Sequence, residues 1–148
     1  ATRHGLPILF HTGTTFCRFA PLRHTRPALW DEVAMRHPDL VMVLAHLGHP
    51  FEAEALVTAR KHPHVYLDLS ALWYRPWQLY NSLILAQEYR VTGKILFGSD
   101  YPFTTPADSI AGLYALNRMV EGTHLPRVSR TALDEIIHRE SLMLLGLE

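Results

Sequence analysis

The stretch Leu40-Val-Met-Val-Leu-Ala-His-Leu-Gly48 carries the clearest signal of fold class. Its first six residues are all apolar, and an apolar run without alternation is typical of a strand buried on both faces. Pro38-Asp39 precedes the run and a turn at His46-Leu-Gly48 follows it. Strands of this kind occur mainly in parallel sheets covered by helices, so the segment predicts an α/β protein.

Three further apolar runs lie on either side of this one, at residues 6–11, 65–70 and 94–97. Helical spacing predicts helices over residues 28–37, 52–61 and 77–89, between these runs. After the last run, Thr105 and Pro106 predict the capped start of a helix that runs to Gly122. A final helix is expected around residues 133–144, ending near Gly146. The alternation predicts four βα units and a parallel sheet.

The composition excludes several classes of protein. Of 148 residues, 48 % are hydrophobic and 19 % are charged, as in ordinary globular domains, which argues against disorder. The formal net charge is zero, so nucleic acid is not an expected partner. Cys17 is the only cysteine, which excludes an internal disulfide and a cysteine-based zinc site. No apolar run is long enough to cross a membrane, and the expected location is the cytoplasm.

Histidine and aspartate recur where the predicted strands end. His11 follows the first run, His46 follows the second, and Asp100 comes shortly after the fourth. Because the carboxyl ends of parallel strands lie at one edge of a sheet, these side chains are expected to converge. Two imidazoles and a carboxylate suit a divalent metal of the zinc type. The simpler interpretation, for each residue alone, is a hydrogen-bonded loop residue.

Other polar and aromatic residues near the strand ends allow two interpretations each. His49 either faces the same pocket as a substrate contact or lies on a solvated turn. Trp73, in an aromatic loop, either forms a wall of the substrate pocket or packs in the core. Asp68 is expected to be structural, as a carboxylate that caps a neighbouring loop.

The strand-end motifs also resemble a known family. They are Pro7-Ile-Leu-Phe-His-Thr-Gly13, Ala45-His-Leu-Gly48, Val65-Tyr-Leu-Asp-Leu-Ser70 and Ile95-Leu-Phe-Gly-Ser-Asp-Tyr-Pro102, with His37-Pro-Asp-Leu between the first two. In this order they are similar to the C-terminal half of the amidohydrolase-related family, which includes decarboxylases and lactone hydrolases. One departure lies near the end, where His138-Arg-Glu-Ser141 stands in place of the family's usual His-Gly-Asn-Ala.

The resemblance implies a (β/α)8 TIM barrel of the metal-dependent hydrolase type, of which residues 1–148 would form the C-terminal portion, roughly strands 5 to 8. It implies one divalent metal ion, zinc or alternatively manganese, with His11 and Asp100 as ligands. His46 and Asp100 would be the catalytic residues. The family's first-strand His-x-His pair has no counterpart here, so the N-terminal half of the barrel is expected to be missing. That half, or a homodimer partner, would close the barrel.

The predicted function is therefore a metal-dependent hydrolase or decarboxylase that acts on a small carboxylated or cyclic substrate through metal-activated water. This chain alone is expected to be inactive. The alternative is a non-catalytic α/β half-barrel module that binds a small molecule or self-assembles. A third possibility is a complete small doubly wound domain, although no glycine-rich phosphate loop supports it.

Overall fold

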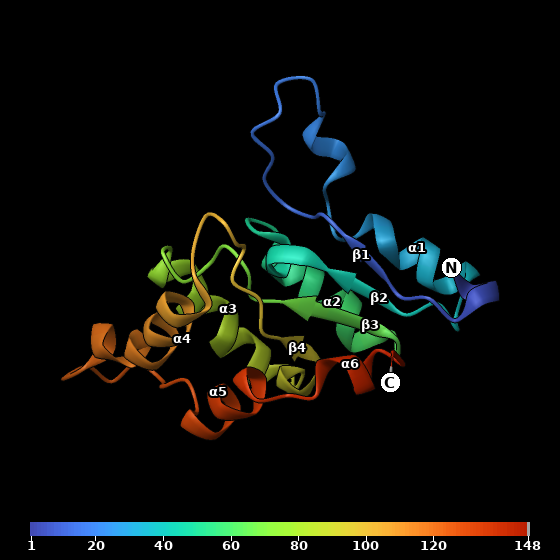
Figure 1. The fold of residues 1–148 in the computed structure, drawn as a ribbon. Coiled ribbons are helices and arrows are strands. Elements are labelled where there is room, and N and C mark those ends of the chain that lie inside the picture. Colours follow the sequence, from blue (N-terminus) through green and yellow to red (C-terminus); the bar gives the residue numbers. More distant parts are fainter. Residues whose placement is uncertain (148) are drawn as a thin grey trace.

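A computed structural model describes residues 1–147 of the chain and shows four parallel strands alternating with helices (Figure 1). The strands are short and lie inside the predicted apolar runs. They are β1 (Ile8–Phe10), β2 (Met42–Leu44), β3 (Val65–Asp68) and β4 (Ile95–Leu96). The α/β prediction is thus confirmed.

The helices that follow the strands also lie close to their predicted positions. Among them α2 begins and ends where the spacing predicts. Their bounds are α1 (Leu29–Arg36), α2 (Glu52–Lys61), α3 (Pro76–Glu88), α4 (Pro106–Ala115), α5 (Arg130–Ile137) and α6 (Ser141–Leu144). Short 3-10 turns occupy Thr2–His4, Leu22–His24, Thr92–Lys94 and Leu116–Val120, and Ala45–Gly48 forms a turn with left-handed residues. None of the helices in residues 1–147 has the length and apolar character needed to cross a membrane.

Two of the helix predictions need correction. The helix capped by Thr105 was expected to reach Gly122, but α4 ends at Ala115 and a 3-10 segment continues to Val120. The final helix is two helices, because the chain leaves the α-helical conformation between Ile137 and Ser141. The predicted cap itself is confirmed, since the Thr105 side chain accepts a hydrogen bond from the backbone N–H of Asp108.

Each strand pairs with the strand before it in the sequence, giving the order β1-β2-β3-β4. Ile8 pairs with Met42, Met42 with Val65, and Leu67 with Ile95, all in parallel register. A doubly wound sheet reverses its strand order at a switch point, whereas this order never reverses over the described strands. The sheet is therefore a continuous arc of βα units.

The two faces of this arc have different coverings. Alternate residues such as Met42, Leu67 and Ile95 are fully buried against α1 to α5 in the main core. Residues on the opposite face, including Val43, Tyr66 and Leu96, pack against the C-terminal segment that carries α6. Leu9 of β1 is 65 % exposed. One face of the sheet is thus built into a core, while the other is covered only in part.

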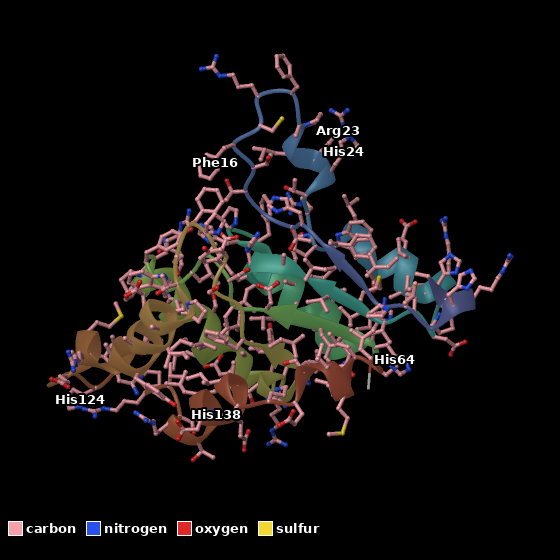
Figure 2. All side chains as sticks on the ribbon, in the orientation of Figure 1. Phe16, Arg23, His24, His64, His124 and His138 are labelled. Atoms are coloured by element: carbon pink, nitrogen blue, oxygen red, sulfur yellow. The ribbon has the colours of Figure 1, made fainter. Side chains whose placement is uncertain are left out.

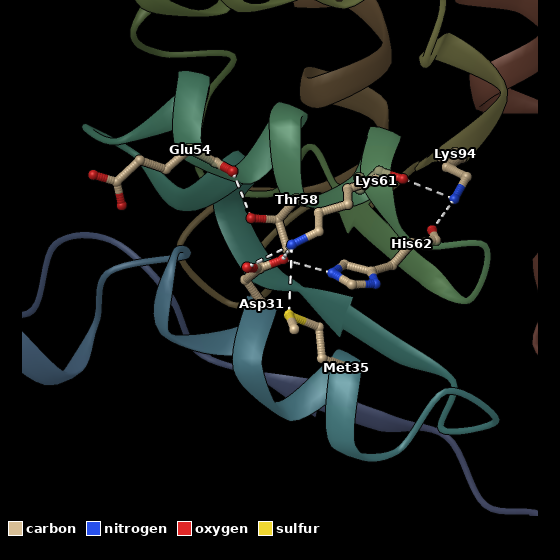
Figure 3. Close-up of polar contacts among 8 residues, drawn as sticks. Asp31, Met35, Glu54, Thr58, Lys61, His62 and Lys94 are labelled. Atoms are coloured by element: carbon tan, nitrogen blue, oxygen red, sulfur yellow. Dashed lines mark hydrogen bonds and ion pairs between the residues drawn. The ribbon is translucent and has the colours of Figure 1, made fainter.

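Polar contacts tie α1 and α2 together on the outer side of the sheet (Figure 3). Asp31 of α1 accepts hydrogen bonds from Lys61 at 2.9 Å and from His62 at 2.6 Å, at the C-terminal end of α2. The Lys94 ammonium donates to the carbonyls of Ala59, at 2.8 Å, and of His62. Cations that donate to the last carbonyls of a helix stabilise that end of it.

Candidate functional site at the carboxyl ends of the strands

The structure brings His11, His46 and Asp100 to one edge of the sheet, as the strand-end argument predicts. All three side chains line a hollow of about 290 Å³ among the loops that follow the strands, termed here the loop hollow. The same three line a second hollow of about 500 Å³ on the partly covered face of the sheet, termed the inner hollow. The rings of His11 and His46 meet edge to face, with their centroids 5.2 Å apart.

Left-handed backbone conformations concentrate at this edge. His46 has a φ of 60°, Leu47 of 47°, Ala71 of 61° and Asp100 of 66°. These residues follow β2, β3 and β4 directly or within a few positions. Such conformations disfavour side chains with a Cβ, at a cost of order 1 kcal/mol or more each, and they are enriched at functional sites. The surrounding contacts therefore hold the chain in turns that the residues themselves disfavour.

The loop after β1 is fastened closely to the loop after β2. Thr12 is fully buried, and its hydroxyl donates to the Ala45 carbonyl at 2.6 Å. The backbone N–H of Thr14 donates to the His49 carbonyl at 2.6 Å. Gly13, with a φ of 85°, permits this contact, because a Cβ there would lie 1.9 Å from the His49 carbonyl oxygen. This close approach holds the His11 loop against the His46 turn.

His46 is held by Asp68, the last residue of β3, and by Ser70, which follows that strand. Its Nδ1 lies 2.6 Å from the Ser70 hydroxyl and 3.3 Å from the Ser70 carbonyl. The Asp68 Oδ1 accepts from the backbone N–H of Ser70 at 2.8 Å and from that of His46 at 3.3 Å. It also accepts from the Ser70 hydroxyl. Asp68 thus caps the turn after β2, the structural role that was expected.

The donor chemistry of the edge fits part of a metal site. His11 Nε2 lies 2.9 Å from the Thr14 carbonyl, so this nitrogen donates and Nδ1 is left as the basic nitrogen. Within residues 1–147, however, no three His, Cys, Asp or Glu side chains gather closely enough to hold a metal ion. His11 and Asp100 are therefore suitable in type, and a complete ligand set requires further donors.

Two further polar side chains reach the loop hollow. His49 lines it, with Nδ1 2.6 Å from a carboxylate oxygen of Glu52. Arg75 also lines it, with one guanidinium nitrogen 2.5 Å from the Ala71 carbonyl and the guanidinium 4.6 Å from the Tyr74 ring centre. Arg75 was missed in the sequence, although it lies on the loop after the third apolar run, where the same strand-end argument applies.

The aromatic residues of the loop between β3 and α3 lie in two places, one against the core and one at the site. Trp73 packs on α4, where a Cβ on Gly112 would come within 2.9 Å of its ring. Among the described residues, the lining of the loop hollow includes its neighbour Tyr74 and not Trp73. Trp73 therefore packs against the core, the second of its two interpretations. Its neighbour Tyr74 lies next to the site.

The other histidines of the described residues, apart from His49, lie outside both hollows. Figure 2 labels His24, His64, His124 and His138, and all four lie at the periphery of the molecule. Phe16, on the same loop between β1 and α1 as His24, is 88 % exposed and lines the loop hollow. The histidines that line the two hollows are thus His11, His46 and His49.

Comparison with known proteins gives one family and several similar structures. A protein-family model described as Amidohydrolase matches residues 1–135. A TIM-barrel protein from Bordetella bronchiseptica is similar to this chain with a TM-score of 0.71 and 23 % identity, over 99 % of this chain and 47 % of its own length. No match is found among curated proteins.

Two other similar structures belong to enzymes. An amidohydrolase from Burkholderia multivorans with bound zinc has a TM-score of 0.57 and 19 % identity, over 80 % of this chain and 48 % of its own. The 2,6-dihydroxybenzoate decarboxylase from Rhizobium has a TM-score of 0.62 and 14 % identity, over 99 % and 53 %. This chain thus spans about half the length of the structures it matches, and its four strands form about half of a TIM barrel.

Proposed function

This chain belongs to the amidohydrolase family, and from that premise we propose that it supplies one wall of the active site of a metal-dependent hydrolase or decarboxylase. One observation carries the proposal: His11, His46 and Asp100, which come from the ends of three different strands, line the same loop hollow. In parallel α/β folds, catalytic residues come from the carboxyl ends of several strands.

His11 and Asp100 would hold one divalent metal ion, zinc or manganese, together with donors from outside this chain. The chemistry supplied by such an ion, when bound, would be polarisation of a substrate carbonyl and a lower pKa of water. Zinc is supported by the related amidohydrolase that carries it and by the histidine and carboxylate donors of this edge.

The proton chemistry would fall to Asp100 and His46. In a hydrolysis, the Asp100 carboxylate takes the proton of the attacking water and passes it to the leaving group. In a decarboxylation, the protonated form of Asp100 would deliver its proton to the carbon that loses carbon dioxide. The His46 imidazole, in edge contact with His11, orients the substrate carbonyl or the water from the neighbouring strand. Both reactions need a proton carrier and an orienting group at this edge, and Asp100 and His46, which line the hollow, would supply them.

The substrate would carry a carboxylate. Arg75 is the arginine that lines the loop hollow, and no carboxylate of residues 1–147 forms an ion pair with it. Its contacts with Ala71 and Tyr74 fix the guanidinium in place, which favours paired hydrogen bonds to a carboxylate. A related decarboxylase binds 2,6-dihydroxybenzoate, a small aromatic carboxylate. Small aromatic acids and carboxylated lactones are the substrates to try first.

A partner would complete the barrel. β1 forms an open edge of the described sheet, and Leu9 on this strand is 65 % exposed. A second half-barrel, supplied by a longer polypeptide, would pair with the open edges and bring the missing metal ligands. A second copy of this chain is the other way to close the sheet.

The catalytic assignment is tested by Asp100→Asn in the complete protein. Loss of a positioned proton carrier should lower kcat about 10²- to 10⁴-fold on a substrate found among small aromatic acids and lactones. Asp39→Asn, a change at an exposed residue outside both hollows, should leave kcat within twofold. A near-normal kcat for Asp100→Asn would remove Asp100 from the mechanism.

The ligand assignment is tested separately by His11→Ala. Equilibrium dialysis of the complete protein against zinc should show a weakening of at least 10-fold, because one of a small number of donors is gone. His124→Ala, at the periphery, is the matched control. Equal zinc retention in His11→Ala and wild type would show that His11 is not a ligand.

A further inference from the structure

Asp68, Ser70 and His46 form a chain of hydrogen bonds that ends at His46 in the proposed site, and the order of these bonds has a chemical consequence. Asp68 and Ser70 are 8 % and 7 % exposed, and both line the inner hollow beneath His46. Because they are nearly buried, water cannot readily replace the hydrogen bonds between them. The position of each proton in the chain is therefore set by the protein.

At the Asp68 end of this chain of hydrogen bonds, the carboxylate oxygen Oδ1 is an acceptor. Oδ1 receives the backbone N–H groups of Ser70 at 2.8 Å and of His46 at 3.3 Å, and these groups can only donate. The Ser70 hydroxyl donates to the same oxygen. A hydroxyl has one proton, so once it is committed to Asp68, the oxygen of Ser70 is an acceptor toward any other neighbour.

The histidine end of the chain follows from this. His46 Nδ1 lies 2.6 Å from the Ser70 hydroxyl oxygen and 3.3 Å from the Ser70 carbonyl oxygen. The carbonyl can only accept, and the hydroxyl oxygen is left as an acceptor as well. Both contacts therefore require a proton on Nδ1. In the neutral imidazole, the lone pair is then on Nε2.

We propose that Asp68 and Ser70 are positioning residues that hold His46 in the tautomer protonated on Nδ1. Nε2 is then the nitrogen free to accept a proton or a hydrogen bond in the hollow shared with His11 and Asp100. Without Asp68, the Ser70 hydroxyl can rotate and donate to Nδ1, which favours the opposite tautomer. The use of this free nitrogen in catalysis rests on the proposed function, whereas the tautomer does not.

The inference is tested by NMR on the full 148-residue chain labelled with ¹⁵N-histidine. Two-bond correlations distinguish the protonated ring nitrogen from the basic one. Wild-type His46 should show a single pattern with the proton on Nδ1. In Asp68→Ala, the population protonated on Nε2 should rise about five- to tenfold, the change expected for the loss of one net hydrogen bond. Asp68→Asn keeps an acceptor oxygen and should retain the wild-type pattern.

Two controls separate this effect from a loosened fold. Ser82→Ala removes another buried hydroxyl, one that donates to the Gln78 carbonyl within α3, and should not change His46. His62, whose Nε2 contacts Asp31, should keep its own pattern in all variants. A wild-type His46 protonated on Nε2 overturns the inference, and so does a folded Asp68→Ala with an unchanged pattern. Should Asp68→Ala fail to fold, the wild-type spectrum still decides.

Turnover is not read in this experiment. An Nδ1–H tautomer together with a fully active Asp100→Asn variant would leave the positioning chain standing and reject the catalytic proposal. The opposite pair of results would reject the positioning chain alone.

Discussion

At the scale of single residues, the candidate site is built on conformations that most side chains avoid. Asp100, His46 and Ala71 all have positive φ angles, and neighbouring contacts compensate for their cost. Asp68 binds the backbone N–H of His46, and Arg75 binds the carbonyl of Ala71. The strained turns are thus stabilised by the same side chains that line the two hollows.

A specificity prediction belongs at this scale. Arg75→Gln should raise KM for a carboxylate substrate about 10- to 100-fold, because a charge-assisted hydrogen bond is worth about 1.5–3 kcal/mol. The KM for the corresponding ester or amide should change by less than threefold. Steady-state kinetics of the complete protein on such a matched pair measures the difference.

Arg130→Gln is the matched control for this experiment. Arg130 pairs with Asp134 on α5, away from the hollows, and its removal should affect neither substrate. If Arg75→Gln raised KM equally for the acid and its ester, the arginine would not be recognising a carboxylate.

At the scale of elements, the outer helices are joined by ion pairs with a defined pH response. Hydrogen bonds from Lys61, and then from His62, hold the pKa of Asp31 below its ordinary value of 3.8. A carboxylate whose pKa is lower in the folded state stabilises the fold above its unfolded pKa. This contribution is lost as the pH falls through the folded pKa. The contact between α1 and α2 should therefore weaken in acid below about pH 4.

Asp31→Asn tests this response. At pH 7 the substitution should lower the free energy of unfolding by about 0.2–1 kcal/mol, the range for partly exposed ion pairs. At pH 2.5, which is closer to the lowered pKa of this carboxyl, the difference in stability between the two proteins should be smaller. Urea titrations at both pH values measure the difference, with Glu121→Gln, an exposed loop residue, as control. A gap that widens in acid would contradict the assignment.

At the scale of the whole molecule, one face of the sheet is buried in the main core, and the opposite face is covered only in part. The main core buries five helices against the sheet, whereas α6 and its neighbours cover only part of the other face. The edge of β1 has unpaired backbone groups in the described structure, and its Leu9 is largely exposed. Exposed strand edges with apolar side chains favour association.

The chain by itself is therefore expected to associate in solution. Light scattering after size exclusion should give a mass above the 16.9 kDa of a monomer. Leu9→Asp should shift the mass toward the monomer, because a charge on this face opposes contact with another apolar surface. Leu125→Asp, at a comparably exposed leucine of the loop before α5, should not shift it. A wild-type monomer at all concentrations would contradict the open-face interpretation.

The order of the elements and the place of the site follow from the sequence, because burial imposes local periodicity. The six apolar residues before His46 predict β2, and the helical spacing over residues 52–61 predicts α2 to its end residues. Catalytic residues of parallel α/β folds follow the carboxyl ends of the strands, and this rule selects His11, His46 and Asp100 as candidates. Motif order supplies the family, which the match over residues 1–135 confirms.

Only the tertiary structure decides which neighbours a side chain meets, since that depends on loop conformations and on contacts far apart in the sequence. Trp73 packs on α4, whereas Arg75, two residues later on the same loop, lines the loop hollow. The hydrogen bond between His46 and the Ser70 hydroxyl joins residues 24 positions apart, and no local pattern encodes it. The periodicity of apolar residues in the sequence indicates which side chains are buried. The direction of a side chain in the loop after a strand depends instead on backbone angles that the whole fold imposes.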